Sequence, residues 1–302
     1  MTRLDAFDAV ALPTPLLVLD AGRGTIFGKA EFVLPSGSIK HRSIPPRLFE
    51  LRRGGVLGPG RAVVIHSAGS AAVAAAWAGA RGDLRVHAVV PRDAAEPMLA
   101  ALGWLGAAAY PVASAEAADF IAALCEREGA YFLDQFADVA LRQGYAVVAD
   151  EIAAQCPDVD AVVVGVGTGG SVTGIAARLR ELRARCHVFG VEPDEARVTQ
   201  GRPWAPHGIP GLAPPATRTL FDAALVDEVV PVPTATAWQW ARRLARDRGV
   251  LVGPSSGATV AAAHALRERG YRRIVAILSG ALAEVLTLER LGRYAHRMDD
   301  ER

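Results

Sequence analysis

Short apolar runs alternate with longer stretches of helical character along this chain. The runs cover residues 62–67, 85–91, 161–164, 187–192 and 273–278. They are rich in β-branched residues, end at loops, and are mostly followed by helical patterns. Alternation of strands and helices is typical of parallel sheets whose faces are covered by helices. The pattern therefore predicts an α/β fold.

Length and charge narrow the class of protein. With 302 residues, of which 51% are hydrophobic and 22% charged, the chain is long enough for two packed domains. Lys and Arg number 33 against 32 Asp and Glu, so no net field of either sign attracts nucleic acid or an anionic membrane. We expect a small-molecule partner, and neither a nucleic-acid nor a membrane partner.

The N-terminal sequence fits neither a secretory signal nor a transit peptide. It carries Asp5 and Asp8, and Pro13 interrupts its apolar stretch. The longest run of small apolar residues, 71–80, is half of the roughly 20 residues that cross a bilayer. We expect a cytoplasmic protein.

The cysteines and histidines do not predict a metal site. Cys125, Cys156 and Cys186 lie far apart without a metal-ligand spacing, as expected of reduced thiols in a cytoplasmic protein. The seven His residues form no paired ligand pattern.

Only two lysines, Lys29 and Lys40, occur in the chain. Lys40 closes the turn-forming segment 35–40 at the expected start of a helix, where the helix N-terminus and burial would lower the pKa of its amine. A neutral amine can attack an aldehyde. Taken alone, the segment fits an exposed lysine at a helix start better, and only the neighbouring loops favour the reactive amine.

A glycine-rich loop, 165–171, follows an apolar strand and opens a helix. Its backbone amides and the positive end of the helix dipole predict a phosphate cradle, to which Thr168 and Ser171 would add hydroxyl donors. A glycine-rich turn without a ligand is the simpler alternative. Consecutive glycines cost stability, however, unless the backbone must approach something closely. No lysine follows as in a nucleoside triphosphatase.

The same loop also matches a dinucleotide fingerprint. Gly165, Gly167 and Gly170 have the required spacing, and Glu192 lies about twenty residues on, at the end of the next strand. An NAD(P)-dependent oxidoreductase is therefore an alternative, although it leaves Lys40 unexplained.

Two more loops open helices. Segment 67–71 follows a strand, so its amides would point at an anion such as a substrate carboxylate. Ordinary capping by Ser67 or Ser70 explains this loop equally well. Segment 253–257 is similar, and either of its serines would serve as a cap.

Six motifs occur together, in chain order, over nearly the full length. Together they resemble the cysteine synthase family of fold-type II pyridoxal phosphate enzymes, which includes cystathionine β-synthase and O-acetylserine sulfhydrylase. The motifs are 13–16, 29–31, 35–42, 167–171, 191–193 and 253–258.

The resemblance implies a tryptophan synthase β-like fold of two three-layer α/β/α domains with pyridoxal 5'-phosphate between them. The large domain would comprise residues 1–35 and 145–302, and the smaller domain residues 36–144. It also implies a homodimer.

The family's functional residues match positions in this chain. The resemblance implies that Lys40 forms the Schiff base and removes the Cα proton. Ser255 would face the pyridine nitrogen, and Gln135 would contact the substrate carboxylate. The cofactor phosphate would be held by Gly167, Thr168, Gly169, Gly170 and Ser171.

The implied reaction is β-replacement or β-elimination on an O-activated serine or a related amino acid. A neutral hydroxyl at the ring nitrogen favours expulsion of a β-substituent, which gives an aminoacrylate that a nucleophilic second substrate attacks.

The substrate loop departs from the family. The usual Ser/Thr-Ser-Gly-Asn-Thr reads Ser67, Ala68, Gly69, Ser70 and Ala71, so Ser70 replaces an asparagine expected beside the ring oxygen of the cofactor. Loss of such a hydrogen bond costs about 1.5–3 kcal/mol. We therefore expect a non-standard substrate or nucleophile in a specialised biosynthetic pathway. A catalytically silent cofactor-binding partner protein is a further alternative.

Overall fold

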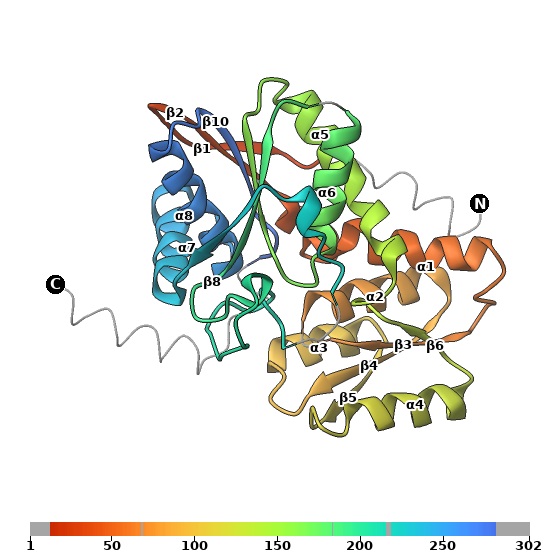
Figure 1. The fold of residues 1–302 in the computed structure, drawn as a ribbon. Helices are drawn as coiled ribbons and strands as arrows, with labels where there is room; N and C mark the ends of the chain where they lie inside the picture. Colours follow the sequence, from red (N-terminus) through yellow and green to blue (C-terminus); the bar gives the residue numbers. More distant parts are fainter. Residues whose placement is uncertain (1–12, 68, 183, 216–218, 282–302) are drawn as a thin grey trace.

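The computed structural model describes residues 13–67, 69–182, 184–215 and 219–281. Its helices and strands form two lobes, each built around one sheet (Figure 1). In chain order these elements are β1 Leu16–Gly22, β2 Gly24–Lys29, α1 Ile44–Arg53, β3 Ala62–His66, α2 Ser70–Gly82, β4 Arg85–Pro91, α3 Glu96–Trp104, β5 Ala108–Val112, α4 Ala117–Glu128, β6 Tyr131–Leu133, α5 Ala146–Gln155, β7 Ala161–Gly165, α6 Gly170–Glu181, β8 His187–Pro193, β9 Glu228–Val232, α7 Thr234–Arg248, α8 Pro254–Glu268 and β10 Arg273–Ile277.

Both sheets are largely parallel. The six-stranded sheet has the order β1-β2-β10-β7-β8-β9, and only its β1–β2 pair is antiparallel. The four-stranded sheet, β5-β4-β3-β6, is parallel throughout. The predicted α/β class is confirmed, and each apolar run named above forms one of these strands.

Helices cover both faces of the six-stranded sheet. Successive residues of a strand point to opposite faces, so Val163 of β7 packs in the core under α7 and α8. Its neighbours Val162 and Val164 pack in the core under α5 and α6. The fully buried strands are thus apolar on both sides, which explains why their sequences do not alternate.

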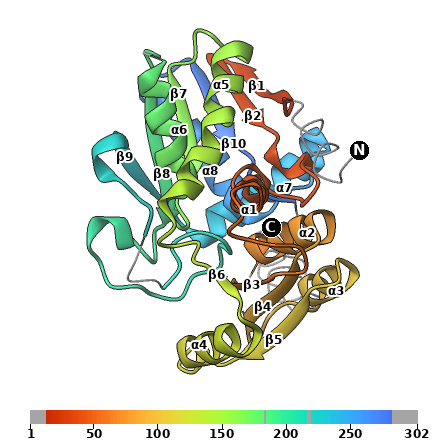
Figure 2. The same cartoon turned by 90° about the vertical axis from the view of Figure 1, so that its right-hand side faces the viewer.

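The four-stranded sheet is layered in the same way. Val63 and Ile65 of β3 pack with residues of α1, α2 and α3, whereas Val64 packs with α4. Figure 2 shows α4 on the outer face of this sheet. The arrangement confirms the three-layer α/β/α architecture in both lobes.

Local boundaries differ slightly from those that the patterns predict. The helix that the loop at 165–171 was expected to open begins at Gly170, inside that loop. Part of the segment assigned to the smaller domain bonds to the other lobe, since Ser38 bridges to Gly280. The domain boundaries stay a prediction, and the tail beyond 281 lies outside the described residues.

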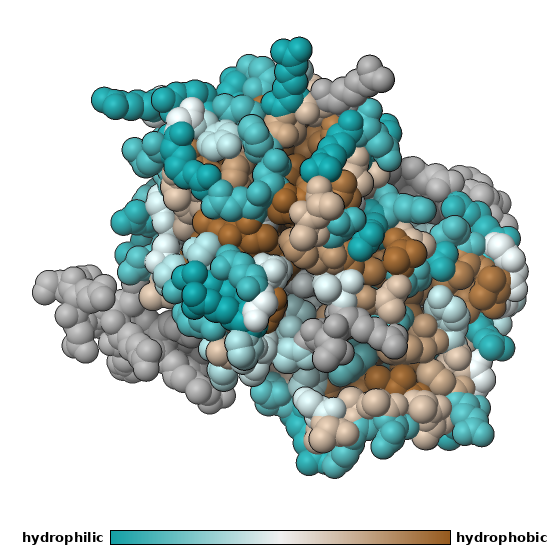
Figure 3. All heavy atoms as spheres, in the orientation of Figure 1, coloured by the Kyte–Doolittle hydropathy of each residue, from teal (hydrophilic) through white to brown (hydrophobic). Residues whose placement is uncertain are grey.

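The described surface is mixed in polarity. On the face seen in Figure 3, hydrophilic residues cover much of the outline and hydrophobic residues gather in smaller areas between them. None of the helices in the described ranges is long and apolar enough to cross a membrane. Over the same ranges, no group of three or more His, Cys, Asp or Glu residues is arranged to hold a metal ion.

Candidate active site

Lys40 does not lie where its sequence context suggests. It sits in a short 3₁₀ helix, Ile39–Arg42, and α1 begins only at Ile44. The expected effect of an α-helix N-terminus on this amine is therefore wrong. Burial alone lowers the pKa of Lys40, to about 8. A substantial fraction of the amine is neutral near physiological pH, as a nucleophile requires.

The amine of Lys40 contacts groups from both lobes. Its Nζ lies 3.4 Å from Oε1 of Gln135, in the loop after β6. It also lies 3.5 Å from Oγ1 of Thr168, in the glycine-rich loop after β7. Strands β6 and β7 belong to different sheets, so Lys40 contacts one loop from each sheet.

Gln135 is held in place by the neighbouring strand of its own sheet. Its Nε2 donates a hydrogen bond to the carbonyl oxygen of His66, at 2.8 Å, at the carboxyl end of β3. Strands β3 and β6 are adjacent and parallel, so their carboxyl ends bring Gln135 beside the loop that starts at Ser67. Gln135 is 7% exposed and keeps a second amide hydrogen for a ligand.

The glycine-rich loop presents uncapped amides. Helix α6 begins at Gly170 after Gly169, which has φ 84° and offers no side chain as a cap. The carbonyl oxygen of Thr168 accepts bonds from the amide of Leu220 and the hydroxyl of Thr219. The protein thus occupies a carbonyl of the loop. The amide of Gly170 donates a long hydrogen bond, 3.5 Å, to Oγ1 of Thr168. The N-cap residue Gly169 offers no side chain to the amides that follow, which suits an anion site.

Two glycines of this loop are required by the protein itself. A Cβ at Gly167 would lie 2.3 Å from the carbonyl oxygen of Gly211. A Cβ at Gly169 would lie 2.2 Å from the backbone nitrogen of Phe221. The close approach expected of this loop is therefore made by the chain segment that runs over it.

The loop at 67–71 is not capped in the ordinary way. Oγ of Ser67 accepts a bond from the amide of Gly69, and α2 begins at Ser70 with no side-chain cap. Capping by Ser67 or Ser70 is therefore not what these serines do. Ala71 is 2% exposed and packs in the core of the smaller sheet. Ala68 lies outside the described residues.

Ser255 lies in the first turn of α8, which also has no side-chain cap. Its Oγ lies 3.2 Å from Oγ of Ser279, in the loop after β10. The carbonyl oxygen of Ser279 in turn accepts a bond from the amide of Ile39, at 2.8 Å. Ser255 is thus connected to the Lys40 segment through one intervening residue, and capping by Ser255 is wrong.

The dinucleotide alternative fails at Glu192. This carboxylate is fully buried and accepts bonds from the backbone amide and the hydroxyl of Thr199. Burial raises its pKa. Glu192 therefore holds the chain after β8 and is not available to a ribose hydroxyl.

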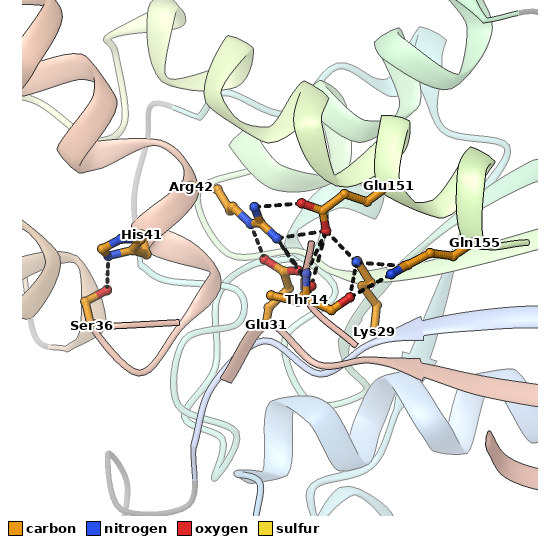
Figure 4. Close-up of polar contacts among 8 residues, drawn as sticks. All are labelled: Thr14, Lys29, Glu31, Ser36, His41, Arg42, Glu151 and Gln155. Carbon is orange, nitrogen blue, oxygen red and sulfur yellow. Dashed lines mark hydrogen bonds and ion pairs between the residues drawn. The ribbon is translucent and has the colours of Figure 1, made fainter. Parts of the chain in front are cut away.

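A buried cluster of charged and polar side chains lies close to Lys40 in the chain, and the motif analysis did not identify it. Figure 4 shows its members converging. They are Thr14, Lys29, Glu31, Arg42, Glu151 and Gln155. Glu151 and Gln155 lie on α5, outside the six motifs.

The geometry agrees with a comparison to known protein families. A family model described as "Pyridoxal-phosphate dependent enzyme" matches residues 9–280. This chain belongs to that family. The resemblance drawn from the six motifs is thereby confirmed, and pyridoxal phosphate is the cofactor of the enzyme.

Curated relatives of this pyridoxal phosphate enzyme point to one group within the family. Cysteine synthase 3 of Caenorhabditis elegans is 32% identical over 268 residues, which cover 85% of this chain and 80% of the relative. O-ureido-L-serine synthase of Streptomyces lavendulae is 30% identical over 258 residues, with coverage of 81% and 78%.

Solved structures agree. The crystal structure of an O-ureido-L-serine synthase matches with a TM-score of 0.88 and 27% identity, covering 96% of this chain and 95% of that one. The cysteine synthase of Entamoeba histolytica matches with a TM-score of 0.86 and 25% identity, covering 93% and 88%. The predicted fold-type II architecture is confirmed.

The residues around Lys40 fit this cofactor chemically. A primary amine whose pKa is lowered to about 8 suits condensation with an aldehyde. The uncapped start of α6 suits a phosphate. A hydroxyl at Ser255 suits a ring nitrogen that is not protonated.

Proposed function

We propose that this enzyme catalyses β-replacement, or simple β-elimination, on an O-activated serine or a related amino acid. The observation that carries the proposal is the position of Lys40, whose Nζ lies within 3.5 Å of both Gln135 and Thr168. The relatives support the reaction type, since cysteine synthases and O-ureido-L-serine synthase are named among them.

Three groups of residues would hold the cofactor. Lys40 would bind its aldehyde, the amides and hydroxyls of 167–171 its phosphate, and Ser255 its ring nitrogen. When bound, the cofactor supplies an electron sink for the Cα of the amino acid.

The remaining roles belong to side chains and amides of this chain. Lys40, once displaced from the cofactor by the amino group of the substrate, would take the Cα proton on Nζ. Gln135 would donate its free amide hydrogen to the substrate carboxylate, and the uncapped start of α2 at Ser70 would face the same group. A nucleophilic second substrate would then add at Cβ in the replacement reaction.

The altered substrate loop supports a non-standard substrate or nucleophile. Ser70 has a hydroxyl on Cβ where the asparagine of the family has a carboxamide. Its side chain is therefore shorter and reaches less far toward a ligand. A bulkier leaving group or nucleophile would fill the space. We further propose a homodimer in the cytoplasm, in a specialised biosynthetic pathway, with the domain division 1–35 and 145–302 against 36–144.

A visible absorption spectrum tests the proposal. The purified enzyme should absorb in the visible region, and Lys40→Ala should abolish that band. Adding O-acetylserine, O-phosphoserine, serine and cysteine in turn should shift the band with the amino acid that carries a suitable leaving group. A band that survives in Lys40→Ala would contradict the assignment. A band that no amino acid shifts, with no turnover, would favour the catalytically silent cofactor-binding protein.

A further inference from the structure

The buried cluster around Arg42 pairs every charge it contains. Arg42 and Lys29 supply two cations, and Glu31 and Glu151 supply two anions; all four side chains are 6% exposed or less. Buried charges are costly unless they are paired and hydrogen-bonded. This cluster meets that condition with a neutral total.

Arg42 is the centre of the cluster. Its Nε and Nη2 donate to the two oxygens of Glu31, at 2.8 and 3.2 Å. Its Nη1 and Nη2 also contact the two oxygens of Glu151, each at 2.9 Å. Arg42 therefore makes two forked contacts at once, which the planar guanidinium allows and the single ammonium of a lysine does not.

The other members complete the cluster from distant parts of the chain. Nζ of Lys29 donates to Oε2 of Glu151 at 2.5 Å, to the carbonyl oxygen of Thr14 at 2.7 Å and to Oε1 of Gln155 at 2.9 Å. The hydroxyl of Thr14 donates to Oε1 of Glu31. The cluster thus joins the segment before β1, the end of β2 and helix α5.

Arg42 is the only member that comes from the 3₁₀ helix of Lys40. The two residues are separated by one position, and the amide of Ser43 closes the turn on the carbonyl oxygen of Lys40. Glu151 lies on α5, which packs against α6, the helix that opens with the phosphate loop. A continuous path therefore runs from Lys40 through Arg42 and Glu151 to the loop of Thr168.

We propose that Arg42, held by Glu31 and Glu151, is a positioning residue for Lys40. The cluster sets the place of the 3₁₀ helix relative to the phosphate loop, and the contact of Ile39 with Ser279 holds the other side of the same turn. The side chain of Arg42 acts only through the backbone of Lys40. This inference rests on the proposed function of Lys40.

The test compares Arg42→Lys with a matched variant, Arg47→Lys. Arg47 also pairs with two carboxylates, those of Asp138 at 2.8 Å and Glu50 at 2.9 Å, but through one nitrogen each, and it lies on α1 outside the cluster. Hydrogen exchange of the backbone amides of 38–43 is measured first, on cofactor-free and on loaded protein. We expect exchange at least about tenfold faster in Arg42→Lys and unchanged in Arg47→Lys.

Kinetics with the amino acid that shifts the visible band, carrying deuterium at Cα, provide the second readout. Misplacing a base by about 1 Å costs on the order of 10²-fold, so kcat of Arg42→Lys should fall about that far while KM changes little. The deuterium isotope effect should rise, because Cα proton removal becomes slower than the other steps. Arg47→Lys should leave the isotope effect unchanged.

If Arg42→Lys does not fold, Glu31→Gln takes its place, because it keeps the side-chain shape and weakens one fork. A folded variant that loses thermal stability but keeps the exchange rate of 38–43 and the isotope effect would overturn the proposal. Failure of the proposed function is a separate result, since the visible band would then survive in Lys40→Ala whatever Arg42 does.

Discussion

Nζ of Lys40 lies 3.5 Å from the hydroxyl oxygen of Thr168, although the two residues are 128 positions apart. The amine thus lies beside the glycine-rich loop. Among the described residues its side-chain hydrogen-bond partners are both neutral, namely Gln135 and Thr168. No carboxylate offsets the cost of burying its charge, so the pKa falls to about 8.

Uptake of pyridoxal phosphate by the cofactor-free protein should therefore depend on pH around 8. The neutral amine is the reactive form, and its fraction rises from about a tenth at pH 7 to about nine tenths at pH 9. Stopped-flow absorbance should show an uptake rate that rises about ninefold over this range and then levels. Pyridoxal, which lacks the phosphate, is the control and should react more slowly with the same pH profile. A rate still rising steeply above pH 10 would contradict the lowered pKa.

Gly169→Ala should destabilise the protein more than an ordinary substitution at a left-handed glycine. Gly169 has φ +84°, and a Cβ there would lie 2.2 Å from the nitrogen of Phe221. We expect a loss of at least about 2 kcal/mol in the free energy of unfolding in urea. Gly201→Ala is the matched control, because Gly201 has φ +76° and open space around it, and should lose about 1 kcal/mol. Equal losses in the two variants would show that the backbone of Phe221 moves to make room for the new Cβ.

Glu192→Gln should leave the protein at least as stable at neutral pH. Burial raises the pKa of Glu192 above 4.5, so ionisation of this carboxyl costs stability in the folded state. Relative to the variant, the wild type should be most stable at low pH and lose stability as pH rises through the folded pKa. Each unit of pKa elevation corresponds to about 1.4 kcal/mol. Urea unfolding of both cofactor-free proteins between pH 4.5 and 8 measures the difference, and a trend in the opposite direction would refute it.

The same carboxylate decides against a dinucleotide cofactor. Because Thr199 occupies both oxygens of Glu192, titration with NADH should give no binding to wild type or to Glu192→Gln. The fluorescence of NADH is the measurement. Saturable binding that Glu192→Gln weakens would restore the oxidoreductase interpretation.

Ser70→Asn should shift the enzyme toward O-acetylserine. The longer side chain restores an amide at the start of α2, and a hydrogen bond to a charged group is worth about 1.5–3 kcal/mol. We expect kcat/KM for O-acetylserine to rise about tenfold or more. An unchanged or lower kcat/KM would show that Ser70 does not set the substrate.

Several parts of the fold and of the site were predictable because they depend on short-range patterns. Apolar runs that end in loops predict the buried strands, which are β3, β4, β7, β8 and β10. The glycine-rich loop at 165–171 was recognisable because few sequences place so many glycines between a strand and a helix. The loop at 67–71 was harder, since capping by Ser67 was an equally good interpretation until the hydrogen bond to Gly69 was seen.

Other features depend on contacts that form only in the folded protein. The sequence around Glu192 does not predict that Thr199 donates hydrogen bonds to its carboxylate, because the turn between them forms only in the folded protein. Glu151 lies 109 positions from Arg42, so no local pattern pairs them. The lowered pKa of Lys40 was expected, but its cause is burial and not an α-helix N-terminus, because the turn at 39–42 is a separate 3₁₀ helix.

The sequence by itself determined the strand and helix pattern, the family and its cofactor, because these follow from local periodicity and from motifs read along the chain. Only the tertiary structure decided which of these motifs meet. It placed Lys40 between Gln135 and Thr168 and brought Arg42 together with three other buried charges. Contacts of this kind depend on how two sheets pack, and packing is a property of the whole chain rather than of any one segment.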